Sequence, residues 1–156
     1  MMMTYLPTWL RGGGVVVHVR PEPTDWKLPT DAVKLSSFHI TLLGRKVFAG
    51  REDAMAAVWD VVQPALPLPP QPQLGVRVNV QIEGGRKTWF LDVVNQGDYR
   101  SYVEQLLEKL NGELQARGQK VFAQLPADRY FHMTVANNCG GDPMKSIGSI
   151  RPPGEN

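Results

Sequence analysis

The chain has 156 residues, of which 42% are hydrophobic and 21% are charged, as in a globular protein with a core of its own. We therefore expect one domain over residues 1–156. The formal net charge of +2 tolerates an anionic ligand but excludes the strongly basic surface of a protein that coats nucleic acid.

Cysteine and histidine content argues against disulfides and zinc. Cys139 is the one cysteine of the chain, and the three histidines show no zinc-binding spacing, so we expect neither metal nor cofactor. No apolar run approaches the roughly 20 residues that span a bilayer. Met1 to Leu10 lacks the basic leader and apolar stretch of a secretory signal. We expect a cytoplasmic protein without a membrane partner, of unknown oligomeric state.

The first half of the chain predicts a strand, an irregular excursion and a helix. Val15–Val19 is rich in β-branched residues and predicts a buried strand. The excursion that follows is forced by Pro21, Pro23 and Pro29, and it returns at Leu35. Apolar residues at helical spacing predict a helix from Arg51 to Gln63. Five prolines in residues 64–72 then predict a semi-rigid connector between two lobes.

The second half predicts a hairpin, a long helix and a final strand. Val76–Ile82 and Thr88–Val94 flank a turn with two glycines and form the hairpin. We expect Asp98 to cap the long helix and Gly118 to end it. The tail from Gly140 to Asn156 either folds over the site or stays mobile. Strand pairs separated by two helices indicate an α+β fold.

One short pattern occurs twice. His39 lies two residues before Thr41, and His132 lies two residues before Thr134, each within an apolar segment. Residues i and i+2 of a strand point to the same side, so each segment presents an imidazole and a hydroxyl together. The intervening apolar residues face the opposite side and predict a core-facing surface.

Two His-x-Thr motifs in apolar strands, separated by most of a small domain, resemble the two-histidine (2H) phosphoesterase superfamily, with its RNA ligase-like proteins and cyclic phosphodiesterases. The order of the predicted elements agrees along most of the chain. The resemblance implies a bilobal fold in which two antiparallel sheets with outer helices surround a central cleft. The two motifs would face each other across that cleft.

A narrower resemblance lies near the end of the chain. Tyr130–Asn137, followed by Gly141-Asp142-Pro143 and Lys145–Gly148, is similar to phage-type anti-CBASS nucleases, which destroy the cyclic-oligonucleotide alarm signals of bacterial immunity. This likeness implies a cyclic-oligonucleotide substrate, and a location in the host cytoplasm if the chain is phage-encoded.

The motifs fit phosphodiester hydrolysis without a metal. Cleavage requires one proton to be taken and one to be given, and imidazoles do both near neutral pH. His39 and His132 are therefore the expected acid and base, in an order that the sequence leaves open. Thr41 and Thr134 are expected to donate to the phosphate. The substrate would be a cyclic oligonucleotide or an RNA end carrying a 2′,3′-cyclic phosphate.

Three further residues are candidates for substrate binding. Arg45 follows the first motif and Lys145 follows the second, where each could reach a phosphate. Tyr5 precedes the first strand and could stack on a base, although packing of the N-terminal segment explains it equally well. His18 lacks a threonine two residues later, and we expect a structural role for it.

Two other functions compete with hydrolysis. A non-catalytic nucleotide- or RNA-binding module of the same fold would keep the cleft, but binding alone does not require two titratable groups. A ligase is the third alternative. The sequence shows neither the nucleotide-activating lysine motif nor the phosphate loop that a ligase would need.

Overall fold

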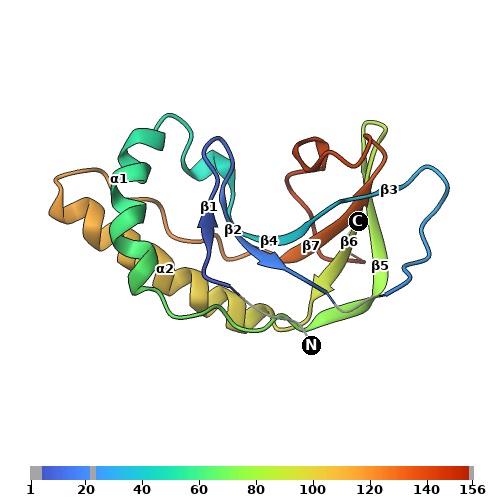
Figure 1. Cartoon of the computed structure of the whole chain (residues 1–156), viewed down its shortest axis with the longest axis horizontal. Helices are drawn as coiled ribbons and strands as arrows, with labels where there is room; N and C mark the ends of the chain where they lie inside the picture. The colour runs from blue at the N-terminus through green and yellow to red at the C-terminus, as the bar shows by residue number, and fades with distance from the viewer. Residues whose placement is uncertain (1–4, 22–23, 155–156) are drawn as a thin grey trace.

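The computed structural model describes residues 5–21 and 24–154 (Figure 1). Pro23 therefore lies outside the described residues, as do the first four and last two residues of the chain. The strands are β1 Thr8–Trp9, β2 Val15–Val19, β3 Val33–Lys34, β4 Phe38–Leu43, β5 Leu74–Glu83, β6 Arg86–Val93 and β7 His132–Asn137. The α-helices are α1 Glu52–Val62 and α2 Gln96–Ala116, and the short 3-10 helices are η1 Arg45–Val47, η2 Gln63–Ala65 and η3 Pro143–Lys145.

The described strands form one seven-stranded sheet in the order β1-β2-β4-β7-β6-β5, with β3 also paired to β7. Every described pairing is antiparallel. The α+β class predicted from the sequence is confirmed. The expectation of two separate sheets is not met, because β4 pairs with β7 through Ile40 and Met133 and this joins the two halves into one sheet.

One face of the sheet packs against both helices. Alternate residues of β2, β4, β6 and β7 are buried together with the apolar sides of α1 and α2 in one cluster. Trp59 and Trp89 belong to this core, as expected from the sequence. Since strand side chains alternate between faces, the residues between these core positions point to the opposite face, which the helices leave open.

The end of α2 was predicted correctly from the sequence, but its beginning was not. Gly118 has φ +68° and ends the helix, with the Gln119 amide donating to the Leu114 carbonyl over 2.9 Å. The predicted cap at Asp98 is wrong, because the helix already begins at Gln96 and Asp98 lies in its first turn.

No helix within residues 5–21 and 24–154, α2 included, has the length and apolar content of a membrane span.

The proline-rich connector is fixed to α2 by two tyrosines. Tyr99 donates its hydroxyl proton to the Pro70 carbonyl over 2.8 Å, and Tyr102 donates to the Pro67 carbonyl over 2.6 Å. Proline cannot offer a backbone N–H, so carbonyl acceptors are what such a segment can present to a partner. Burial raises the pKa of both phenols, that of Tyr102 to about 12, so they stay donors at all ordinary pH.

The hairpin forms as predicted, with an exposed edge. Gly84 and Gly85 have φ +55° and +83°, which is the backbone of the two-residue turn that suits twisted strands. Along β5, however, the apolar side chains extend past the helices. Val76 is 99% exposed, and Val80 and Ile82 are about half exposed.

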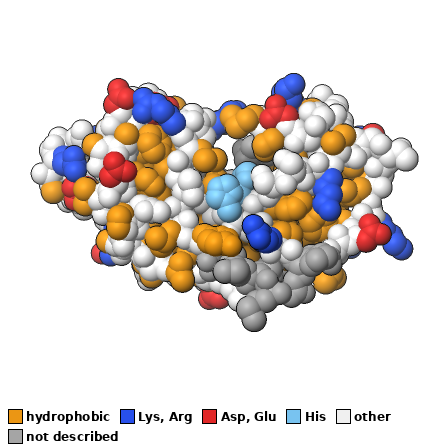
Figure 2. Space-filling model, viewed as in Figure 1, with side chains coloured by type: hydrophobic (Ala, Val, Ile, Leu, Met, Phe, Trp, Pro, Cys, Tyr) orange, Lys and Arg blue, Asp and Glu red, His pale blue; other side chains and the backbone are white. Residues whose placement is uncertain are grey.

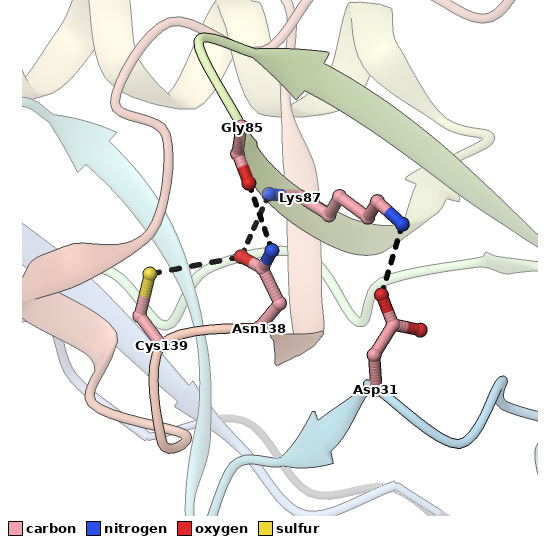
Figure 3. A network of polar contacts seen from close by, with 5 residues as sticks. All are labelled: Asp31, Gly85, Lys87, Asn138 and Cys139. Carbon is pink, nitrogen blue, oxygen red and sulfur yellow. Dashed lines mark hydrogen bonds and ion pairs between the residues drawn. The ribbon is translucent and has the colours of Figure 1, made fainter.

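A polar network fastens the end of β7 to the hairpin and to the segment before β3 (Figure 3). The Lys87 amide donates to Asn138 Oδ1 over 2.8 Å, and Asn138 Nδ2 donates to the Gly85 carbonyl over 2.9 Å. Lys87 Nζ reaches back to Asp31 at 2.9 Å. Because β3 leads directly into β4, this network holds the segments that carry both motifs.

The C-terminal tail packs on the open face of the hairpin rather than staying mobile. Ile147 donates its amide to Thr88 Oγ1 over 2.9 Å, and the Arg151 amide donates to Gln81 Oε1 over 2.8 Å. Ile147 and Ile150 are buried in a small second cluster with Phe90 and Tyr130. The tail therefore covers part of β5 and β6, on the same face of the sheet as the motifs.

Candidate functional site

The two His-x-Thr motifs lie on adjacent strands of the open face. Ile40 pairs with Met133 and both are fully buried in the core. Continuing that antiparallel register by one residue each way sets His39 opposite Thr134 and His132 opposite Thr41. Each imidazole thus has the other motif's hydroxyl as its cross-strand neighbour. Figure 2 shows the histidine side chains gathered at the middle of this face.

His39 is half buried on β4. Burial lowers its pKa below the usual 6.5, and the neighbouring His18 lowers it further because two positive rings would repel each other. At neutral pH the ring is therefore mainly uncharged in the free protein. A bound phosphate would favour the protonated ring by supplying the missing negative charge.

His132 sits in a more enclosed environment at the start of β7. Its ring is stacked on Tyr130 with 12° between the planes, and the edge contact to Phe90 has centroids 5.7 Å apart. Its Nδ1 atom is buried without a hydrogen-bond partner among the described residues. Burial, with smaller effects from Arg129 and His39, lowers the His132 pKa to about 3. The enclosed Nδ1 leaves Nε2 as the nitrogen available to a ligand.

The two threonines present hydroxyls that are not used elsewhere. Thr41 and Thr134 are both half buried, and within the described part of the chain neither hydroxyl makes a hydrogen bond to protein. Unused donors beside two imidazoles are suited to the non-bridging oxygens of a phosphate. The structure therefore places the four motif residues on adjacent strands, and their role in catalysis stays a prediction.

Arg129 lies beside the motifs and was not predicted, because no pattern in the sequence marks it. Its Nη2 donates to the Thr41 carbonyl over 2.6 Å, and its Nη1 donates to the Tyr130 carbonyl. The guanidinium lies 4.5 Å from the ring centroid of Phe131. Burial lowers the Arg129 pKa to about 10, so it keeps its charge at neutral pH. It ties the first motif to the residues just before the second and adds positive potential beside His132.

Asp92 was also missed, since a lone aspartate in a strand carries no signal. It pairs with His132 across β6 and β7 and therefore lies on the same face. Tyr130 donates its hydroxyl proton to Asp92 Oδ1 over 2.7 Å. Burial, then this contact, raises the Tyr130 pKa, which keeps the phenol protonated. Tyr130, whose ring stacks on His132, thereby holds the Asp92 carboxylate next to that imidazole.

The structure changes the expectation for His18. It does not sit in the core with a backbone partner, but is exposed on the open face directly opposite His39. The two ring centroids are 6.4 Å apart with 75° between the planes. His18 lies in a run of valines with no alternating pattern, so the sequence does not show which face it points to, and its structural role stays a prediction.

The three predicted binding residues lie in different places. Tyr5 lines a pocket of about 450 Å³ together with His18. Arg45 is exposed in η1, beyond the far end of β4 from His39. Lys145 is exposed in η3 of the tail. Neither Arg45 nor Lys145 lines the Tyr5 pocket.

No group of three or more His, Cys, Asp or Glu side chains among residues 5–21 and 24–154 is arranged to hold a metal ion. Comparisons with protein-family models, curated proteins and solved structures found no match for this chain.

Proposed function

We propose that the protein is a phosphodiesterase of the 2H type, acting on a nucleotide phosphodiester by acid/base catalysis with His39 and His132. The observation that supports this most directly is the pairing of Ile40 with Met133, which lie at the centres of the two motifs, because it sets the motifs side by side on adjacent strands β4 and β7. Such a site has approximate twofold symmetry. A phosphate between the strands would meet one nitrogen base from each side and one hydroxyl from each side.

The two imidazoles have different environments, which favours different roles. The base must begin neutral, and His132 is strongly kept neutral by its aromatic enclosure. The acid must begin protonated, and His39 is the less enclosed of the two, so a bound phosphate has a smaller burial effect to offset there. We therefore assign His132 to remove the proton of the attacking oxygen and His39 to protonate the leaving oxygen. Each transfer contributes about 10² to 10⁴ in rate.

Thr41 and Thr134 would hold the non-bridging oxygens, and the charge of Arg129 would favour the anion from close by. Both proton transfers are assigned to imidazoles, so the proposal calls for no metal ion. The substrate is either a cyclic oligonucleotide or a 2′,3′-cyclic phosphate at an RNA end. A bilobal arrangement fits this role, with the halves on either side of the β4–β7 pairing forming the two lobes.

The test is a substrate screen in the presence of a chelator. It compares RNA ended by a 2′,3′-cyclic phosphate, cyclic dinucleotides and larger cyclic oligonucleotides, with wild type, His39→Ala and His132→Ala. Gln105→Ala, an exposed change on α2, is the matched control. We expect turnover by wild type and the control and none by the histidine variants, with the fold checked by circular dichroism. Retention of most activity by either histidine variant would overturn the mechanism.

A non-catalytic nucleotide- or RNA-binding module is the second candidate. The observation that favours it is that burial keeps both imidazoles neutral in the free protein, as in a site that only binds. The same screen separates the two functions. A module of this kind would bind the oligonucleotides by calorimetry and leave every one of them intact.

A further inference from the structure

A pocket beside the histidines is built for a second anionic group. It lies where β2 ends and β4 begins, and its volume is about 450 Å³. Its walls include His18, Arg20, Trp26, Lys34 and Phe38. None of these was assigned a binding role by the sequence.

The pocket is lined by two cations that have no acidic partner among the described residues. Arg20 and Lys34 both line it and both are exposed. Among the described residues, no carboxylate lies within ion-pair distance of either one. Two unpaired cations facing one hollow favour a phosphate, which can accept hydrogen bonds from both.

The same pocket has an aromatic wall that is held in place. Trp26 meets Phe38 edge to face at 5.3 Å, and Lys34 Nζ lies 4.9 Å from the Trp26 ring centroid. Trp26 also packs against the core while staying partly exposed. A fixed indole next to cations is the combination with which proteins hold a nucleobase and its phosphate.

The pocket and the motif site share a wall. His18 lines the pocket, and its ring is 6.4 Å from the ring of His39. Arg20 follows the last residue of β2 directly and lines the same pocket as His18. A ligand with its reacting phosphate between the two motifs would therefore reach the pocket with its next nucleotide.

We propose that this pocket binds the nucleotide adjacent to the phosphodiester being cut, with its phosphate on Arg20 and Lys34 and its base against Trp26. The preferred substrate then carries at least two phosphates, as a cyclic dinucleotide or a dinucleotide ending in a 2′,3′-cyclic phosphate does. This inference rests on the proposed function for the reacting phosphate. The occupancy of the pocket itself can be measured without turnover.

The kinetic test compares substrates that differ by one nucleotide. Wild type, Arg20→Gln and Lys34→Gln are assayed with a mononucleoside 2′,3′-cyclic phosphate, the dinucleotide with the same end, and a cyclic dinucleotide. We expect each variant to lower the ratio of kcat/KM for a two-phosphate substrate over the mononucleoside one by about 10- to 100-fold. Lys109→Gln, which removes an exposed charge from α2, is the control. An unchanged ratio in both pocket variants would overturn the proposal.

The aromatic wall has its own pair of variants. Trp26→Leu should weaken two-phosphate substrates by about 5- to 150-fold, and Trp26→Phe should restore most of that loss because a ring is again present. Equal losses in both variants would mean that the indole only packs, and would remove the base from the proposal.

A binding measurement separates failure of the pocket from failure of catalysis. Calorimetry with a phosphorothioate cyclic dinucleotide, which resists cleavage, is applied to wild type, Arg20→Gln and Lys34→Gln. Weaker binding by the variants supports the pocket even if wild type cleaves nothing and the proposed function fails. Equal binding by all three proteins, or no binding by wild type, would overturn the pocket even if hydrolysis is observed.

Discussion

The ring of Tyr130 lies nearly parallel to the ring of His132, with 12° between the planes and 6.3 Å between the centroids. The hydroxyl of that tyrosine is hydrogen-bonded to Asp92, which is the cross-strand neighbour of His132. Tyr130 therefore covers one face of the imidazole and also donates a hydrogen bond to the neighbouring carboxylate. This double role separates the environment of His132 from that of His39.

Replacing Tyr130 by Phe should raise the pKa of His132. The aromatic ring stays, but the Asp92 carboxylate loses its hydrogen-bond donor. Its negative charge then favours the protonated form of the neighbouring imidazole. The loss of a hydrogen bond to a charged acceptor should also lower the free energy of unfolding by about 1.5–3 kcal/mol. NMR titration of the histidines and urea unfolding measure the two effects. An unchanged His132 titration would show that Asp92 does not act on the imidazole.

The rate should have an acidic optimum in kcat/KM. The base works only when neutral, and its pKa of about 3 sets the rise. The acid works only when protonated, and the His39 pKa, lowered below 6.5, sets the fall. The alkaline limb in kcat should lie higher than in kcat/KM, because the bound phosphate stabilises the His39 proton. Steady-state rates across pH test this, and a kcat/KM that still rises above pH 6.5 would contradict the assignment.

Protonation of His132 should also make the fold sensitive to acid. Its folded pKa lies below that of the unfolded chain, so the unfolded state binds more protons as the pH falls below 6.5 and stability declines. The slope from one such group approaches about 1.4 kcal/mol per pH unit. His132→Phe keeps an aromatic ring and removes the titration, so its unfolding free energy should vary less between pH 6.5 and pH 4. Parallel slopes for the two proteins would assign the acid sensitivity to other groups.

The threonines should affect the transition state more than the fold. Thr41→Val and Thr134→Val keep the side-chain shape but remove the hydroxyl, and each should lower kcat by about 10- to 10³-fold. The matched controls are Thr41→Ser and Thr134→Ser, which retain a donor and should keep most of the activity. If the valine variants turn over at the wild-type rate, the hydroxyls do not contact the phosphate.

The network around Asn138 should matter for stability alone. Asn138→Ala removes the acceptor of the Lys87 amide and the donor to Gly85, and none of these three residues lines the pocket that contains Arg20 and Lys34. Losing these bonds should lower the free energy of unfolding by about 1–3 kcal/mol. Chemical denaturation checks the loss. A fall in kcat without a loss of stability would show that the network acts on the site directly.

The elements and motifs were predictable where the pattern is local. The helix at Glu52–Val62, the hairpin around Gly84-Gly85 and the end of α2 at Gly118 each follow from periodicity or backbone freedom within a few residues. The motif threonines and histidines share a face because a strand alternates. These are properties that a short stretch of chain determines by itself.

The rest depends on pairing between distant segments, which no local pattern encodes. His18 joins the site only because β2 pairs with β4 in the register that sets it against His39. Asp92 and Arg129 acquire their positions in the same way, from β6 and from the segment before β7. Arg45 and Lys145 were predicted to bind substrate because they follow the motifs in the sequence. The cations that line the pocket beside His18 are instead Arg20 and Lys34.

The bond from Arg129 to Thr41 joins residues 88 positions apart. The hairpin of β5 and β6 closes through a two-residue turn and belongs to the fastest events of folding, within microseconds. Pairing of β4 with β7 closes a much longer loop, and this closure costs conformational entropy. The contacts that offset this cost form only when most of the intervening chain is ordered, so we expect this pairing to form late. A nascent chain that has not yet released β7 from the ribosome thus carries one motif without its counterpart. The two halves of the site meet only after β7 has been synthesised.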